Sequence, residues 1–165
     1  MSSSRKKAIV RKYSRDWVAG YLPVSGFSEN GQLELLDLDG KVTRLTLEDV
    51  KWVCYVRDFN SGEPSNPERL LRKTFAGRPR SEGLWLRLRM KDNEQVEGIA
   101  ANDLSLLEND GIFLTPPDTR SNTQRIFVPR SSIVELEVVA VIAPSSKRKA
   151  ADSELQESLF SPREP

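Results

Sequence analysis

Residues 32–47 read QLELLDLDGKVTRLTL, so two runs of alternating apolar and polar side chains flank the pair Asp39-Gly40. Alternation with a period of two is typical of a β-strand with one buried face. An Asp-Gly pair between two such runs favours a tight hairpin, because both central residues of a type I′ turn need positive φ. The stretch therefore predicts two antiparallel strands joined by a short turn.

The same alternation continues on both sides of this hairpin, in short runs rich in β-branched and aromatic residues. Turn-forming residues separate the runs. In the first half of the chain we expect strands over 7–13, 17–24, 32–38, 42–47 and 50–56. In the second half we expect strands over 84–90, 95–101, 112–116, 124–129 and 132–142. The 165-residue chain is thus predicted to be all-β.

The two halves resemble each other as copies of one unit. Trp17-Val18-Ala19-Gly20 aligns with Gln95-Val96-Glu97-Gly98, and both place a glycine in the middle of the second strand. Such a glycine is typical of the corner of a small, strongly bent barrel. We therefore expect an internal duplication that gives two tandem five-stranded small β-barrels, at residues 7–57 and 84–143. The alternative is chance similarity between amphipathic strands.

The remaining segments are predicted to be irregular. Residues 1–6 are read as a disordered basic N-terminus, and residues 144–165 as a disordered polar tail. Residues 58–83 form a linker rich in Pro, Gly, Ser and Arg. Within the linker, Asn66 is suited to be an N-cap and Pro67 a first helical residue, which predicts one short helix over 66–73.

The composition argues against catalysis. The chain has no histidine, one cysteine (Cys54) and a formal net charge of +1. Histidine-based nucleophiles, imidazole metal ligands, an internal disulfide and a cysteine-only zinc site are therefore excluded. We assign no catalytic residue, no metal and no cofactor. No apolar run approaches the length of about 20 residues that spans a bilayer, so we expect no membrane contact and a cytoplasmic protein.

Basic residues are distributed unevenly along the chain. Arg87 and Arg89 alternate with Leu86 and Leu88, so both guanidinium groups are expected on one face of a strand. If the first strands of both halves lie on one side, their cations form a stripe that can follow phosphates. The residues that we expect to contact nucleic acid are Arg11, Lys12, Arg72, Lys73, Arg87 and Arg89. Tyr13, Trp17 or Trp85 would then offer a stacking surface for an unpaired base. The alternative is a solvated strand face with basic ends.

The C-terminal tail carries a short motif, Gln156-Glu157-Ser158-Leu159-Phe160. It resembles the pentapeptide by which many bacterial proteins dock on the replication sliding clamp. The resemblance implies that Leu159 and Phe160 fill an apolar pocket and that Gln156 adds an orienting hydrogen bond. The alternatives are a tail that folds back on a barrel and a tail with no fixed partner.

Three family resemblances bear on the whole chain. Five short strands with a bent second strand, duplicated, are similar to the Sm-like (SH3-like) small barrel of RNA-binding rings. The segment 111–128, GIFLTPPDTRSNTQRIFV, resembles that of a group of uncharacterised bacterial proteins often found beside signalling modules. This second resemblance covers most of residues 7–141 and implies no established activity. Asp103-Leu104-Ser105 followed by Gly111 resembles the motif of PilZ cyclic-dinucleotide receptors, with Arg72, Arg78 and Arg80 as the arginine arm, although the glycine falls six residues after the serine.

These observations favour a non-enzymatic binding or adaptor module in bacterial regulation. Its first expected ligand is single-stranded RNA or another polyanion, bound through the basic strand face. The alternatives are a protein-interaction scaffold whose tail docks a partner, and cyclic-dinucleotide sensing. The sequence leaves the oligomeric state open.

Overall fold

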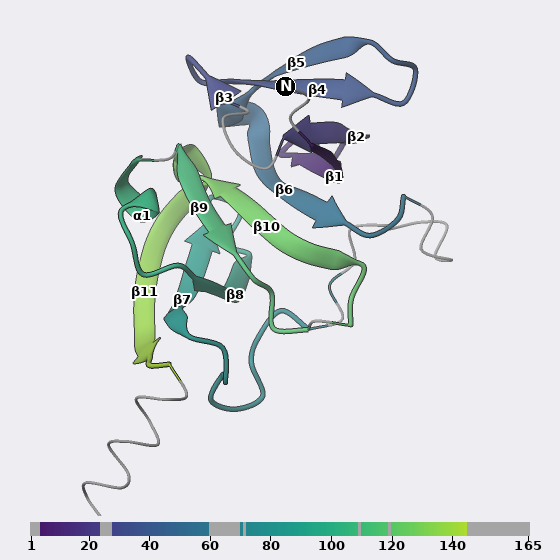
Figure 1. The fold of residues 1–165 in the computed structure, drawn as a ribbon. Coiled ribbons are helices and arrows are strands. Elements are labelled where there is room, and N and C mark those ends of the chain that lie inside the picture. Colours follow the sequence, from purple (N-terminus) through teal and green to yellow (C-terminus); the bar gives the residue numbers. More distant parts are fainter. Residues whose placement is uncertain are drawn as a thin grey trace, which may run out of the picture.

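The computed structural model describes residues 4–23, 28–59, 70, 72–108, 110–118 and 120–144. It confirms the all-β class, with strands in nearly every described part of the chain (Figure 1). The first half holds β1 (Arg5–Lys12), β2 (Trp17–Pro23), β3 (Ser28–Glu29), β4 (Gln32–Asp37), β5 (Val42–Thr46), the 3₁₀ turn η1 (Leu47–Asp49) and β6 (Val50–Val56). The second half holds β7 (Gly83–Met90), β8 (Gln95–Ala100), α1 (Ser105–Glu108), β9 (Gly111–Leu114), β10 (Thr123–Pro129), η2 (Arg130–Ser132) and β11 (Ile133–Ile142).

Every strand expected from the alternating pattern overlaps an observed strand. The structure differs from the prediction in the segments outside these strands. The two-residue strand β3 and the single helical turn α1 were not predicted. The disordered N-terminus predicted for residues 1–6 is wrong at its inner end, because Arg5 and Lys6 continue β1 and pair with Pro23 and Leu22. Most of the helix predicted over 66–73 lies outside the described residues. Arg72 and Lys73 are not helical.

The strands form two open sheets and do not close into two separate barrels. The larger sheet has the order β3-β4-β2-β1-β6-β10-β9, with β5 on β4, and the smaller has the order β11-β7-β8. The structure differs from the predicted tandem barrels in the pairing of β6. This strand pairs with β1 on one edge and with β10 of the second half on the other, so it does not close the first half on itself.

Although the barrels are open, the two halves repeat the same connections and the same local geometry. The pairings β1–β2, β2–β4, β4–β5 and β1–β6 correspond to β7–β8, the β8–β9 bridge, β9–β10 and β7–β11. Each first hairpin turns through a residue with positive φ, Arg15 in one half and Asn93 in the other. Each last strand follows a 3₁₀ turn and skips its second residue in the ladder, Lys51 in β6 and Val134 in β11, and β11 has a second skip at Val139. These matches fix which residues of the two halves correspond.

Two apolar clusters form the core. The first-half cluster gathers β1, β2, β4, β5 and one face of β6, and Phe127 of β10 completes it. The second-half cluster gathers β7, β8, β9 and β10, together with Ile9, Trp52 and Cys54 from the opposite face of β1 and β6. All seven residues of β6 are buried, because it lies between the two clusters. In the described part of the chain, no helix is long and apolar enough to cross a membrane.

Candidate functional site

The basic strand face predicted on β7 lies opposite the core. Leu86, Leu88 and Met90 are buried, whereas Arg87 and Arg89 point to the other face of the sheet formed by β11, β7 and β8. The register places Glu97 of β8 beside Arg87, and Glu135 and Glu137 of β11 beside Arg89 and Arg87. This face is therefore lined by both signs of charge.

Each of the two arginines is bonded to carboxylates. Arg87 donates from Nε to Glu97 at 3.0 Å and from Nη1 to Glu137 at 3.1 Å. Arg89 donates from Nη2 to Glu135 at 2.9 Å. Two cations thus face three carboxylates, so this part of the predicted stripe has little charge left for phosphate.

Glu97 lies at the centre of this face, and its role there could not be predicted from the sequence. The residue is 3% exposed, and its carboxylate accepts hydrogen bonds from the Phe75 amide, Trp85 Nε1 and Arg87 Nε. Burial alone would raise the pKa of Glu97, but these donors and the charge of Arg87 outweigh it, so the pKa is lowered. The carboxylate is therefore held ionised at neutral pH, in a structural role.

The segment 72–80 crosses the face next to β8 and is anchored there. The Lys73 carbonyl accepts the Glu97 amide at 3.0 Å, and the Phe75 ring meets Trp85 edge to face at 5.6 Å. The sequence RKTFAGRPR contains no acid. Its cations are all exposed: Arg72, Lys73, Arg78 and Arg80. The segment therefore presents positive charge from a backbone fixed to the sheet.

A second group of charges joins the two halves of the chain at Lys51. The Lys51 ammonium lies 2.6 Å from an Asp92 carboxylate oxygen, also bonds Glu94, and sits over the Trp52 ring at 4.8 Å. Glu94 also bonds Lys73. Burial would lower the pKa of Lys51, but the bonds to Asp92 and Glu94 raise it. This network connects β6, the β7–β8 turn and the basic segment.

We expect Lys51→Met to lower the free energy of unfolding by about 2 kcal/mol, because it leaves two carboxylates close together without their shared cation. Chemical denaturation measures the change. Arg44→Met is the matched control, since the Arg44–Glu34 pair is exposed and should contribute less than about 0.5 kcal/mol. Equal effects of the two substitutions would show that the Lys51 network does not stabilise the fold.

Arg11 and Lys12 lie on β1, beside the residues of β6 that flank Lys51. Arg11 is paired with Trp52 of β6 on one side and with Trp17 of β2 on the other. Trp17 is 47% exposed, so it is the predicted stacking residue that is most open to solvent. Tyr13 is bonded to Ser132 and covered by Lys91, and Trp85 lies under Phe75. The structure thus brings Arg11 together with Trp17, and Lys73 together with Lys51.

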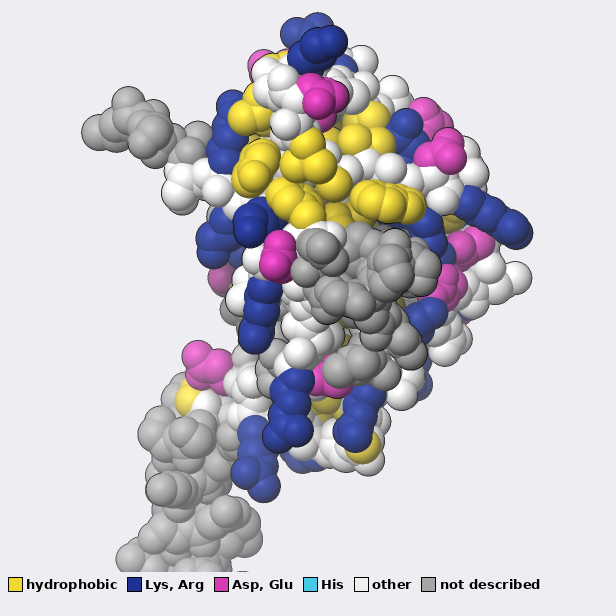
Figure 2. Space-filling view, turned by 90° about the vertical axis from the view of Figure 1, so that its right-hand side faces the viewer, with side chains coloured by type: hydrophobic (Ala, Val, Ile, Leu, Met, Phe, Trp, Pro, Cys, Tyr) yellow, Lys and Arg dark blue, Asp and Glu magenta, His cyan; other side chains and the backbone are white. Residues whose placement is uncertain are grey.

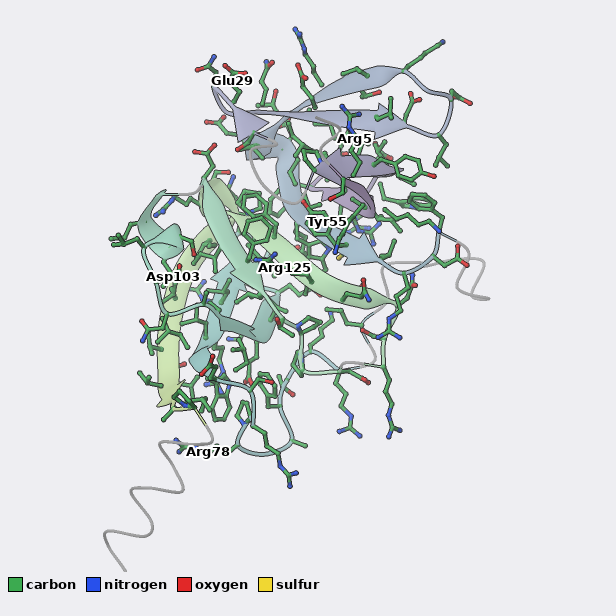
Figure 3. The ribbon with its side chains drawn as sticks, viewed as in Figure 1. Arg5, Glu29, Tyr55, Arg78, Asp103 and Arg125 are labelled. Carbon is green, nitrogen blue, oxygen red and sulfur yellow. The ribbon has the colours of Figure 1, made fainter. Side chains whose placement is uncertain are left out.

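The residues of the predicted cyclic-dinucleotide site do not line one pocket. Asp103 accepts the Ser105 amide at 2.9 Å at the start of α1, and it lines a pocket of about 570 Å³ together with Glu82 and Asn102. Neither Arg78 nor Arg80 lines this pocket, and Figure 3 places Arg78 at the bottom of the fold, away from Asp103. In the described ranges, no group of three or more His, Cys, Asp or Glu residues is placed to hold a metal ion. Gln156, Leu159 and Phe160 lie outside the described residues, so tail docking stays a prediction.

A family model described as a family of unknown function (DUF6982) matches residues 4–140. The resemblance to a group of uncharacterised proteins is thereby confirmed. No curated protein matches the chain, and neither does any solved structure.

Proposed function

Because the chain belongs to the DUF6982 family, whose function is unknown, we propose a function from its surface: a non-enzymatic module that binds single-stranded RNA through phosphate contacts. The site of the proposal is the basic segment 72–80, with Arg11 and Trp17 as a second contact. Arg87 and Arg89, which the sequence favoured, serve instead to bind Glu97, Glu135 and Glu137.

The observation that carries this proposal is the anchoring of an acid-free basic segment on the sheet. Three exposed arginines, Arg72, Arg78 and Arg80, lie on this segment together with Lys73, which is bonded to Glu94. The Lys73 carbonyl and the Phe75 amide both bond Glu97. A fixed backbone loses less entropy on binding than a mobile one. The segment forms the loop at the bottom of Figure 1, and the lower part of Figure 2 shows Lys and Arg side chains that outnumber the acidic ones.

Phosphate contacts predict a characteristic salt dependence. With about four contacts, from Arg72, Arg78, Arg80 and Arg11, the logarithm of the affinity for a single strand falls with the logarithm of salt at a slope of about −2.8. The affinity should therefore drop about 50-fold between roughly 50 and 200 mM salt. Base identity should matter little, because Trp17 can stack on any base.

The test is fluorescence anisotropy of a labelled oligouridine with the full chain. The double variant Arg72→Glu, Arg78→Glu should weaken binding about tenfold or more and reduce the salt slope by about 1.4. The matched control is Lys41→Glu, Arg44→Glu, which makes the same charge change on the β4–β5 hairpin and should leave the affinity within about threefold. No binding at about 50 mM salt, or an equal loss in both double variants, would overturn the proposal.

A further inference from the structure

The last strand of the first half and the last strand of the second half differ in one respect: what covers their outer edge. β6 pairs with β1 on one edge and with β10 on the other. β11 pairs with β7 in the corresponding register from Ile133 to Val138, including the skip at Val134, but no described strand pairs with its other edge. A free strand edge presents unpaired amides and carbonyls that another strand can bond.

The burial of corresponding residues shows the consequence. Val53 and Tyr55 of β6 are 0% and 3% exposed, because Phe127 of β10 and Phe113 of β9 cover that face. The corresponding residues of β11 are Leu136 and Val138, which are 44% and 51% exposed. Val134 and Val141 of the same strand are also more than half exposed. β11 therefore carries an apolar strip along a free edge.

The strand that corresponds to β10 also has a free edge. β5 and β10 are the fourth main strands of their halves, and each runs directly into a 3₁₀ turn. β5 pairs only with β4 among the described strands. Val42 on β5 is 58% exposed, and Leu38 in the hairpin turn before it is 60% exposed. In Figure 1, β11 runs along the left margin of the fold and β5 along the upper margin.

We propose that β11 of one copy of this chain pairs antiparallel with β5 of a second copy, repeating between chains the β6–β10 contact within the chain. In that contact Tyr55 lies opposite Arg125 and Val53 opposite Phe127; Tyr55 and Arg125 are labelled at this junction in Figure 3. The correspondence of the halves then sets the register: Val138 opposite Val42, and Leu136 opposite Arg44. The hairpin turn with Leu38 would extend toward Val141.

The composition of the two edges suits this pairing. Six of the nine large apolar side chains that are exposed among the described residues lie on β11, on β5 or in the turn before β5. A Val–Val pair across antiparallel strands is favourable, and the aliphatic stem of Arg44 can cover Leu136 while its guanidinium stays with Glu34. β5 and its turn carry Lys41, Arg44 and Asp39, and the acids of β11, Glu135 and Glu137, are bonded to Arg89 and Arg87, so charge does not oppose the pairing.

The contact between copies should be weaker than the one inside the chain. In the β6–β10 contact both faces of β6 are apolar, through Val53 and Tyr55 on one side and Trp52 and Cys54 on the other. On β11 the positions that correspond to Trp52 and Cys54 are Glu135 and Glu137, which are charged. Only one face gains apolar burial, so we expect reversible association at about 10 µM. Because β11 and β5 are different surfaces, the contact is head-to-tail and can extend to more than two copies.

The test uses single cysteines at the two residues predicted to face each other. Full chains with Val42→Cys and with Val138→Cys are mixed under mild oxidation, with the unsubstituted chain as control because Cys54 is buried. We expect a disulfide-linked dimer in the mixture and little in either variant alone. A chain that carries both substitutions should give a ladder of linked oligomers. Strong linkage of Val138→Cys to itself would mean that β11 pairs with β11 of its partner, and would overturn the proposal.

Sedimentation velocity of the full chain provides a second, independent readout. Concentration-dependent association is expected, and either Val138→Lys or Val42→Lys should abolish it. Leu107→Lys is the matched control, because Leu107 is 75% exposed and lies on α1, which is neither of the two strands proposed to pair, and it should leave the association unchanged. A monomer at all concentrations up to about 200 µM would overturn the proposal. If the β11 amides of that monomer were nevertheless protected from hydrogen exchange, the outer edge of β11 would be occupied by residues of the same chain beyond Pro144.

Discussion

Gly20→Ala is expected to lower the free energy of unfolding by about 3 kcal/mol, which is a large part of the stability of a domain of this size. A Cβ at this position would lie 2.5 Å from the Leu36 carbonyl oxygen and 2.7 Å from Leu35 Cγ. Neither neighbour can move away cheaply, because β4 is bonded to β5 along its length and Leu35 is fully buried. Urea denaturation followed by tryptophan fluorescence measures the loss.

The corresponding glycine of the second half, Gly98, should behave in the same way. Its Cβ would lie 2.8 Å from Leu114 Cβ and 2.9 Å from the Thr115 carbonyl oxygen. The matched control is Gly77→Ala, since a Cβ at Gly77 meets nothing within 4 Å, and the change should stay within about 0.5 kcal/mol. If Gly20→Ala and Gly98→Ala were as well tolerated as Gly77→Ala, then the close approach of the second and third main strands would not require glycine.

The sequence predicted the strands of this fold but not all of the pairings between them. The alternating runs and the Asp39-Gly40 turn define elements by local contacts, so their positions were predicted within a few residues. The pairing of β6 with β10 joins residues that are far apart in the chain, and no local pattern specifies it. One signal was present: Val50-Lys51-Trp52-Val53-Cys54-Tyr55-Val56 is nearly apolar throughout, which is typical of a strand buried on both faces.

The candidate site was predictable to a similar degree. Alternation placed Arg87 and Arg89 on one face correctly, because a strand fixes which side chains share a face. The same rule places Glu135 and Glu137 on one face of β11. Whether these acids meet the arginines depends on which strands are neighbours, and that depends on the topology. The anchoring of segment 72–80 on Glu97 depends on a loop path for which the sequence has no comparable signal.

The second large effect is expected at Glu97. Glu97→Ala should lower the free energy of unfolding at neutral pH by about 3 kcal/mol, because the Trp85 N–H and the Phe75 amide lose their acceptor and Arg87 loses its buried partner. Glu97→Gln keeps an oxygen acceptor but no charge, so we expect a smaller loss of about 2 kcal/mol. Glu135→Gln is the matched control on the same face, where the partner carboxylate is 64% exposed and the loss should be below about 1 kcal/mol.

The pH dependence separates the charge of Glu97 from its packing. The pKa of Glu97 is lowered in the folded protein, so its ionised form stabilises the fold at every pH above the pKa of about 4.5 that it has in the unfolded chain. This stabilisation is lost as the pH falls through the lower, folded pKa. The difference in stability between the unsubstituted chain and Glu97→Gln should therefore be largest at neutral pH and should shrink between about pH 5 and pH 3. Asp92 and Glu94, whose pKa values are also lowered, titrate in both proteins and cancel in the comparison. A difference that stayed constant down to about pH 3 would mean that Glu97 acts through shape and hydrogen bonding alone, and that its ion pair with Arg87 adds nothing to the fold.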